Sequence, residues 1–268
     1  MSAVIVLRQM LKERTKSTIW WSAAFIVLTV AIGASYPTVR EQASALDAFM
    51  ESMDEGFLEM FGAADGSIAS PVGFWNSNFY ANLFPILLLV LGIGMAAWSI
   101  AGAEREGTLE PLLANPVRRS RVALGRYVGH AIVLAVVTAI STAVLIAFRG
   151  PWDYTEISVT EFVAAGVASL LLALLFTTIT YAIGAATGRK GAAIAGGAGI
   201  AVATFVIFAL AAFVEFFANL RWFSPWYWFL EPSPLADGWT WRSIGLPLLI
   251  IIPVMIIGTV WFTRRDLR

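Results

Sequence analysis

The sequence predicts an all-α integral membrane protein with six transmembrane helices. Of its 268 residues, 59% are hydrophobic and only 13% are charged, which is about half the charged fraction of an average soluble domain. Six apolar stretches approach the roughly 20 residues that a helix needs to cross about 30 Å of hydrocarbon. Because these stretches are continuous, without alternating polar positions, they favour helices over a closed barrel.

The apolar stretches give approximate bounds for the spans. They use nearly half of the chain, so we expect one membrane domain over residues 1–268 and no sizeable soluble domain. The first stretch is too long for a cleaved signal peptide and is predicted to be retained. The expected spans cover residues 19–36, 79–103, 127–148, 162–186, 192–213 and 244–262.

The distribution of basic residues predicts the orientation. An even number of spans places both termini on one side of the membrane, and fourteen of the eighteen Lys and Arg residues fall on that side. The four on the opposite side are Arg40, Arg149, Arg221 and Arg242. Since basic loops remain inside, we expect a multi-pass protein of the cell membrane with cytoplasmic N- and C-termini.

Three segments outside the spans have their own patterns. Residues 4–16 separate apolar from basic side chains, which predicts an N-terminal interfacial helix. Residues 46–61 show apolar residues at helical spacing with acidic residues between them. This pattern predicts an outer amphipathic helix, either a cap above a pathway or a helix resting on the bilayer. Residues 219–242 contain five Trp and three Pro, which favours a short re-entrant or interfacial hairpin anchored at the headgroups.

No catalytic constellation is visible. The chain has no cysteine and no phosphate-binding loop, so we expect it not to be an enzyme by itself, with no catalytic residue, metal ligand or nucleic-acid partner. The single histidine, His130, is interpreted as a packing residue, with proton-linked chemistry as the alternative. Glu215 lies near the outer end of the fifth stretch and is either functional or solvated. Small residues at 184–188 and 195–199 favour close helix contacts within or between subunits.

The connection between the second and third stretches has the most distinctive order of residues. Thr108 is placed to cap a short helix, which Pro116 would stop. Leu109, Leu112 and Leu113 form an apolar stripe on that helix. The alternative is a solvated connector whose arginines meet anionic lipid headgroups.

This connection resembles the one in the permease subunits of type-2 ATP-binding-cassette exporters. The end of the chain, where two arginines and Asp266 follow the last span, also resembles that family. A departure is Pro111, although a proline in a first helical turn costs little. The positions shared with the family's motif are Glu104, Glu106, Gly107, Thr108, Leu109, Glu110, Leu112, Leu113, Pro116, Arg119 and Arg121.

The resemblance implies that residues 104–116 include a coupling helix that docks on a separate ATPase subunit. It implies that two copies of the chain, as a homodimer, form the substrate pathway and are driven by two copies of that ATPase. ATP and Mg would bind the ATPase, and this chain would hold no cofactor. The alternative is an ion-coupled secondary transporter or another six-span membrane protein, such as a channel. A carrier of that kind needs a charged residue at mid-membrane depth. The sequence identifies no substrate and no substrate-binding residue.

Overall fold

The computed structural model describes residues 3–43, 45, 70–109 and 117–266, with side chains from residue 5 onward. Each candidate membrane span in this part of the chain overlaps one of the six predicted stretches, which confirms the all-α integral membrane fold. The amphipathic helix predicted over residues 46–61 lies outside the described residues. The spans are Ile5–Glu41, Pro71–Arg105, Arg119–Ala147, Val159–Thr187, Lys190–Ala211 and Trp241–Arg264.

The second span is not a uniform α-helix. It consists of α4 (Pro71–Trp75), α5 (Leu83–Ala97) and α6 (Ala103–Arg105), joined by the π-helical turns η1 (Asn76–Tyr80) and η2 (Trp98–Gly102). π-Helical turns are rare and often occur at functional sites. The turn η2 stands directly before the connection that the sequence singled out.

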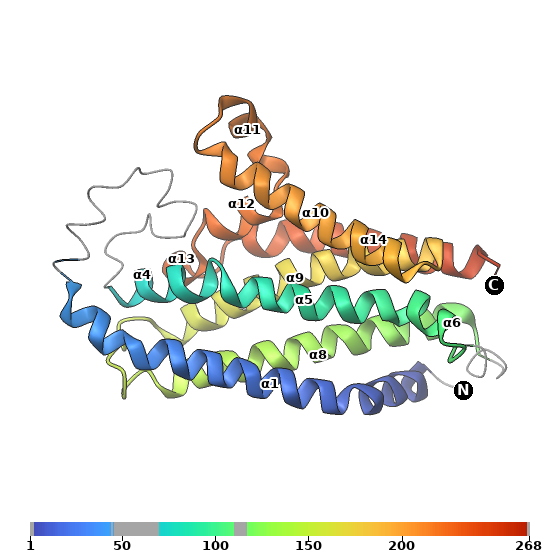
Figure 1. The fold of residues 1–268 in the computed structure, drawn as a ribbon, viewed down its shortest axis with the longest axis horizontal. Helices are drawn as coiled ribbons and strands as arrows, with labels where there is room; N and C mark the ends of the chain where they lie inside the picture. The colour runs from blue at the N-terminus through green and yellow to red at the C-terminus, as the bar shows by residue number, and fades with distance from the viewer. Residues whose placement is uncertain (1–2, 44, 46–69, 110–116, 267–268) are drawn as a thin grey trace.

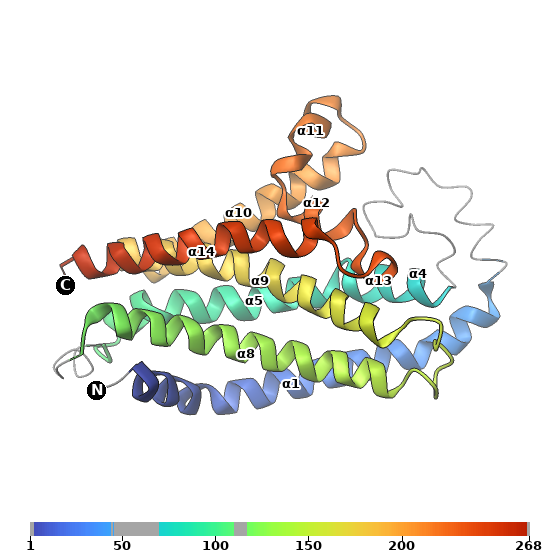
Figure 2. The same cartoon turned by 180° about the vertical axis from the view of Figure 1, so that it is seen from behind.

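Four of the other five spans surround one central helix. The helix α9 (Val159–Thr187) packs against α5, α8 (Arg119–Ala147), α10 (Lys190–Ala211) and α14 (Trp241–Arg264). Figures 1 and 2 show α1 on the outer side of α8, with α10 and α14 on the opposite side of the bundle. Both views also place the start of α1, the end of α14 and α6 at the same end. We call this the terminal end of the bundle.

The predicted N-terminal interfacial helix is not a separate element, which corrects the expectation. Residues 4–16 belong to α1 (Ala3–Glu41), a single helix of 39 residues. At a rise of 1.5 Å per residue it is about 58 Å long, well beyond the roughly 30 Å of the hydrocarbon core. No proline or glycine interrupts its first half. Val6 and Met10 are buried inside the chain, so packing holds this part of α1 against its neighbours.

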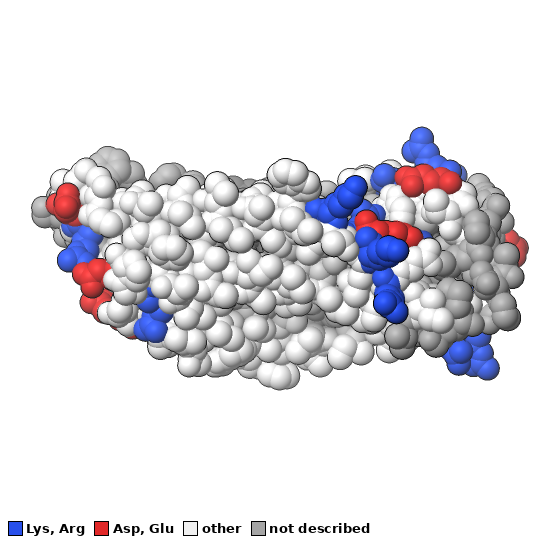
Figure 3. Space-filling view, turned by 90° about the horizontal axis from the view of Figure 1, so that it is seen from below, with Lys and Arg blue, Asp and Glu red and all other residues white. Residues whose placement is uncertain are grey.

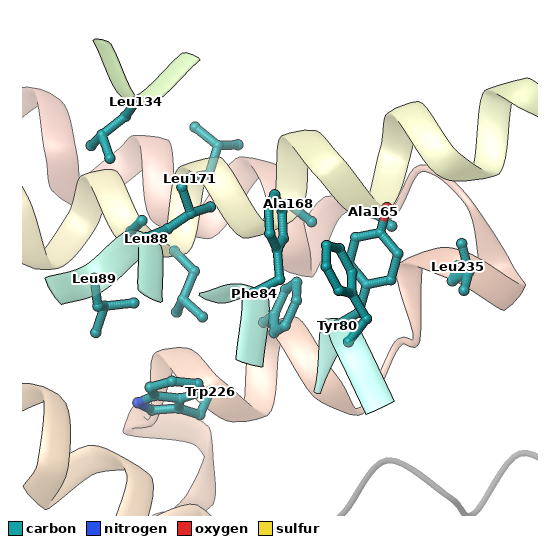
Figure 4. Close-up of a cluster of buried hydrophobic side chains, with 14 of the residues drawn as sticks. Tyr80, Phe84, Leu88, Leu89, Leu134, Ala165, Ala168, Leu171, Trp226 and Leu235 are labelled. Carbon is teal, nitrogen blue, oxygen red and sulfur yellow. The ribbon is translucent and has the colours of Figure 1, made fainter. Parts of the chain in front are cut away.

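The core lies between α5 and α9. Figure 4 shows Phe84 and Leu88 of α5 beside Ala168 and Leu171 of α9. All four side chains belong to one cluster of buried apolar residues. A capping box formed by Ser158 and Glu161 starts α9, so the central helix begins with its first backbone N–H groups satisfied.

The Trp-rich segment is broken into short helices, as its prolines predict. These are α11 (Glu215–Leu220), η3 (Arg221–Phe223), α12 (Pro225–Leu230) and α13 (Pro234–Asp237). Two of its tryptophans differ from the expected headgroup anchors. Trp226 and Trp228 are buried in the bundle, and the Nε1 of Trp226 donates to the carbonyl oxygen of Ala201 at 3.1 Å. The exposed tryptophans of this segment are Trp222, Trp239 and Trp241.

Charged side chains gather at the two ends of the molecule. On the face seen in Figure 3, Lys, Arg, Asp and Glu lie at either end, and a long uncharged band separates them. An uncharged band between two charged ends is the surface that a bilayer requires, because charged groups are costly in hydrocarbon.

The contact between α14 and α9 depends on a glycine. A Cβ atom at Gly258 would lie 2.9 Å from the Cα of Ala182, which is backbone and has little room to move. We expect Gly258→Ala to lower the free energy of unfolding by about 1–3 kcal/mol, as overpacking does. The matched control is Gly94→Ala, since nothing lies within 4 Å of a Cβ at that position. Thermal unfolding in one detergent compares the two variants, and equal melting temperatures would contradict the close approach.

Candidate functional site

The candidate site is the connection from η2 and α6 to α8 at the terminal end of the bundle. The structure describes it up to Leu109 and again from Val117. Four of the residues predicted to contact an ATPase therefore lie outside the described residues: Glu110, Leu112, Leu113 and Pro116. The described flanks make specific contacts within the chain.

Glu104 and Arg119 are both tied to Arg265, just beyond the end of α14. The Nη2 of Arg265 forms an ion pair with the carboxylate of Glu104. These two side chains are only 17% and 10% exposed, so water screens the pair less than it screens a surface pair. The Nη1 of Arg119 donates to the carbonyl oxygen of Arg265 at 2.9 Å. One residue directly after the last span thus contacts both flanks of the connection.

Glu106 is held by the tryptophan of η2. The Nε1 of Trp98 donates to the Oε2 of Glu106 at 3.0 Å. The ring of Trp98 also lies 4.3 Å from the guanidinium carbon of Arg14 and 5.2 Å from that of Arg126. Arg126 is 4% exposed, and its Nη1 donates to the carbonyl oxygen of Ser99 at 2.6 Å. The aromatic ring stabilises two nearby cations through its negative face.

Leu109 differs from the prediction. The sequence placed it on one apolar stripe with Leu112 and Leu113, which the family resemblance assigns to ATPase docking, but its side chain is 1% exposed. It belongs to a buried cluster that includes Val122 and Phe262, with Val117 packed against it. The helical spacing of the leucines was visible in the sequence, whereas the turn that directs Leu109 inward was not. Leu109 therefore anchors the connection to the bundle and is unavailable to a partner.

The turn before Leu109 requires a glycine. Gly107 has a φ angle of +67°, a left-handed conformation that is costly for residues with a Cβ. The chain then folds back, and the Oγ1 of Thr108 donates to the carbonyl oxygen of Ala103 at 3.1 Å. This hydroxyl therefore donates a hydrogen bond to a backbone carbonyl of α6, the helix before the turn. Its predicted role as the cap of the following helix concerns residues outside the described range.

The remaining candidates are placed apart from this site. Arg121 is exposed near the start of α8. Glu215 is exposed as the first residue of α11, beyond the end of α10, so the structure supports its solvated reading. His130 is 1% exposed in α8, and neither ring nitrogen has a hydrogen-bond partner among the described residues. In the described part of the chain, no group of three or more His, Asp or Glu is placed to hold a metal ion.

Three contributors to the site were missed by sequence reasoning. Trp98, Arg14 and Arg126 are brought together from η2, α1 and α8. The available signal was weak, namely an aromatic residue at the end of an apolar stretch and arginines near the starts of two others. Their meeting depends on how three helices pack, which no local pattern specifies.

Comparison with known proteins identifies the family. A family model described as ABC-2 family transporter protein matches residues 4–267. The curated "Probable ABC transporter permease protein NosY" of Pseudomonas aeruginosa is 29% identical over 160 residues, which are 57% of each chain. The protein of the same name from Stutzerimonas stutzeri is 28% identical over 133 residues, 48% of this chain and 47% of the relative. The matches thus span about half the length of these relatives. Because the family model covers nearly the whole chain, and six candidate spans accompany it, the chain belongs to the ABC-2 transporter family as a membrane-spanning permease subunit.

Proposed function

We propose that this chain is the transmembrane subunit of an ATP-driven exporter, with two copies forming the substrate pathway and two copies of a separate ATPase subunit driving it. The observation that carries the proposal is the motif from Glu104 to Pro116, whose described flanks are fixed to the bundle by Arg265, Trp98 and Leu109. Because both flanks are fixed to the bundle, a movement of the segment that a partner causes is passed on to the spans.

The terminal end of the bundle is cytoplasmic in this proposal, and the protein resides in the cell membrane. The excess of Lys and Arg on that side supports this orientation. The ATPase subunit binds ATP and Mg there, since the sequence of this chain contains no loop that cradles phosphates. The chain itself then performs no covalent chemistry and acts as a conformational switch between two states of the pathway.

The exposed side of α10 supports pairing with a second copy. In the most apolar 18-residue stretch of α10, only 22% of the residues are buried within the chain. Ala192, Ala195 and Gly199 lie on its exposed side, and nothing lies within 4 Å of a Cβ at Gly199. Small residues on an uncovered helix allow another backbone to approach closely. Beside them, α5, α10 and α12 line an apolar groove of about 230 Å³ that includes Val90, Val202 and Trp226.

The rival reading as an ion-coupled carrier has less support. Among the described residues, the Lys, Arg, His, Asp or Glu side chains buried in the spans are Arg126 and His130. Arg126 is the eighth and His130 the twelfth of the 29 residues of α8, so both lie in the half of the helix that begins at Arg119. A proton or ion relay needs a series of ionisable groups across the membrane, and two residues one turn apart on a single helix do not form one.

The test of the proposal is reconstitution with a separate ATPase subunit, which we expect a neighbouring reading frame to encode. We expect the two proteins to purify together, with a mass in native mass spectrometry that corresponds to two copies of each. The complex should hydrolyse ATP, and the isolated chain should not, because it has no nucleotide-binding loop. Hydrolysis by the isolated chain, or the absence of any partner with a phosphate-binding loop, would contradict the proposal.

The orientation gives a separate prediction. A reporter fused after Arg268 or inserted after Asn115 should report a cytoplasmic location, and one inserted after Asp65 should report the opposite side, because fourteen basic residues lie on the terminal side. Paired alkaline phosphatase and green fluorescent protein fusions at the three positions make the measurement. Phosphatase activity from the Asn115 fusion would reverse the assigned orientation.

A further inference from the structure

We infer that Arg265 is a positioning residue that fixes the two flanks of the coupling motif to the last span and to the turn between α9 and α10. The residues involved are Glu104, Arg119, Gly188 and Arg265, which we call the Arg265 junction. The inference deepens the proposed function and rests on it, since it gives Arg265 and Gly188 the task of holding Glu104 and Arg119, two residues of the motif.

The first part of the Arg265 junction is the ion pair with Glu104. Glu104 lies in α6, directly before the turn that contains Gly107. Both partners of the pair are largely shielded from solvent. Removing one partner of a shielded pair leaves the other charge without compensation, which costs far more than the loss of an exposed pair. The pair therefore holds the end of α6 against the end of α14.

The second part is the contact with Arg119, the first residue of α8. The guanidinium of Arg119 donates to the carbonyl oxygen of Arg265 at 2.9 Å. This carbonyl follows the last helical residue of α14, Arg264, and carbonyls at helix ends lack a partner within the helix. The same residue of the last span is thus bound to one flank through its side chain and to the other through its backbone.

The third part is the turn after α9. Gly188 ends this helix in a left-handed conformation, with a φ angle of +65°. A Cβ atom at Gly188 would lie 1.9 Å from the Nη1 of Arg265, so the guanidinium occupies space that only a glycine leaves open. It lies at the carboxyl end of a 29-residue helix, where the helix dipole favours a cation. The central helix of the bundle therefore also contacts the Arg265 junction.

The apolar cluster below the Arg265 junction connects the same elements. Phe262 is one turn before Arg265, is fully buried, and shares its cluster with Leu109 and Ala185. Val117 packs against that cluster from the far flank. The last turn of α14 thus holds both flanks through apolar packing and through charge. The consequence is that α9, α14 and the flanks of the motif move as one unit.

The test uses the absence of cysteine in the chain, which allows a single nitroxide label at Arg105→Cys in the full-length protein. The label is read by electron paramagnetic resonance in vesicles of phosphatidylethanolamine and phosphatidylglycerol. Arg265→Gln should increase label mobility several-fold, since the ion pair that holds Glu104 to the end of α14 is removed. The matched control is Arg264→Gln, which makes the same change at an exposed neighbour and should leave the spectrum unchanged. Equal spectra for Arg265→Gln and Arg264→Gln would overturn the inference.

Two further variants separate positioning from misfolding. Gly188→Asn tolerates the left-handed backbone but adds a Cβ that displaces the guanidinium, so it should raise label mobility with every charge retained. Arg265→Lys retains the charge beside Glu104 and should restore most of the immobilisation. A Gly188→Asn spectrum like that of the wild type would count against the Arg265 junction.

A second readout keeps the inference separate from the proposed function. With the ATPase subunit co-reconstituted, Arg265→Gln should reduce ATP hydrolysis by the complex several-fold relative to Arg264→Gln, at equal amounts of both subunits. If label mobility rises while hydrolysis and ATPase binding stay at wild-type values, the Arg265 junction stands and the coupling role of the motif fails. If mobility stays unchanged while binding depends on the motif, the coupling role stands and the inference fails.

Discussion

Leu109→Ala should destabilise the chain, whereas Leu112→Ala combined with Leu113→Ala should weaken ATPase binding without destabilising it. Leu109 is 1% exposed in the cluster with Phe262. Truncating a buried leucine to alanine lowers the free energy of unfolding by about 2–5 kcal/mol. Leu112 and Leu113 lie outside the described residues, and the prediction for them follows from the motif. Each side chain that fills a groove on the partner contributes about 1.5–3 kcal/mol, so binding should fall tenfold or more.

Two measurements on the same preparations separate these effects. The melting temperature of the chain in detergent reports folding, and the dissociation constant for the purified ATPase reports docking. Glu106→Ala is a useful third variant, because Glu106 is exposed and bound to Trp98. It should give a smaller, salt-sensitive loss of binding, as exposed charges do. Unchanged ATPase binding in the double leucine variant would mean that residues 110–116 are only a connector.

The number and order of the spans could be predicted from the sequence because hydrocarbon imposes one rule on every crossing segment. Each apolar stretch became a helix, but most of the helices extend beyond the predicted bounds. The apolar composition marks only where a helix meets lipid. The helix continues through polar residues until a capping residue or turn stops it, as Gly188 does for α9. The predicted interfacial helix failed for the same reason, since residues 4–16 continue directly into the first span.

The internal contacts of the site could not be predicted because they join residues far apart in the chain. Glu104 belongs to the motif, and Arg265 is one of the two arginines that follow the last span, so the sequence pointed to both residues separately. Their pairing across 161 positions depends on α14 returning to the terminal end beside α6. The burial of Trp226 could not be predicted for the same reason. A tryptophan beside prolines suggested a headgroup anchor, but the packing of α12 against α10 buries it.

These contacts also divide the residues of the motif between two tasks. Leu109 and Glu104 contact the bundle, and Gly107 provides the turn between them. The residues left for a partner are those of the segment 110–116, with exposed Glu106 beside it. Under the proposed function, one part of the motif therefore holds the motif in place and the other part contacts the ATPase. Substitutions in the two parts should give different phenotypes, loss of folding in one and loss of docking in the other.

Trp98 should show the largest effect among the polar and aromatic contacts that hold the motif. Trp98→Leu removes the ring beside Arg14 and Arg126 and the donor to Glu106. Two cation–π contacts and one hydrogen bond to a charged acceptor together amount to about 3 kcal/mol of lost stability. Trp98→Phe retains an aromatic face and removes only the N–H donor, so its loss should be about half as large.

Differential scanning calorimetry in one detergent ranks the variants, with Trp20→Leu as the matched control, because Trp20 is 75% exposed on α1. We expect the melting temperature to fall in the order Trp20→Leu, Trp98→Phe, Trp98→Leu. Adding Arg126→Met to each Trp98 variant completes a double-mutant cycle, in which the coupling energy should be present for Trp98→Leu and small for Trp98→Phe. Additive losses for Arg126→Met and Trp98→Leu would show that the ring does not stabilise the arginine. The anchoring of Glu106 would then rest on its hydrogen bond alone.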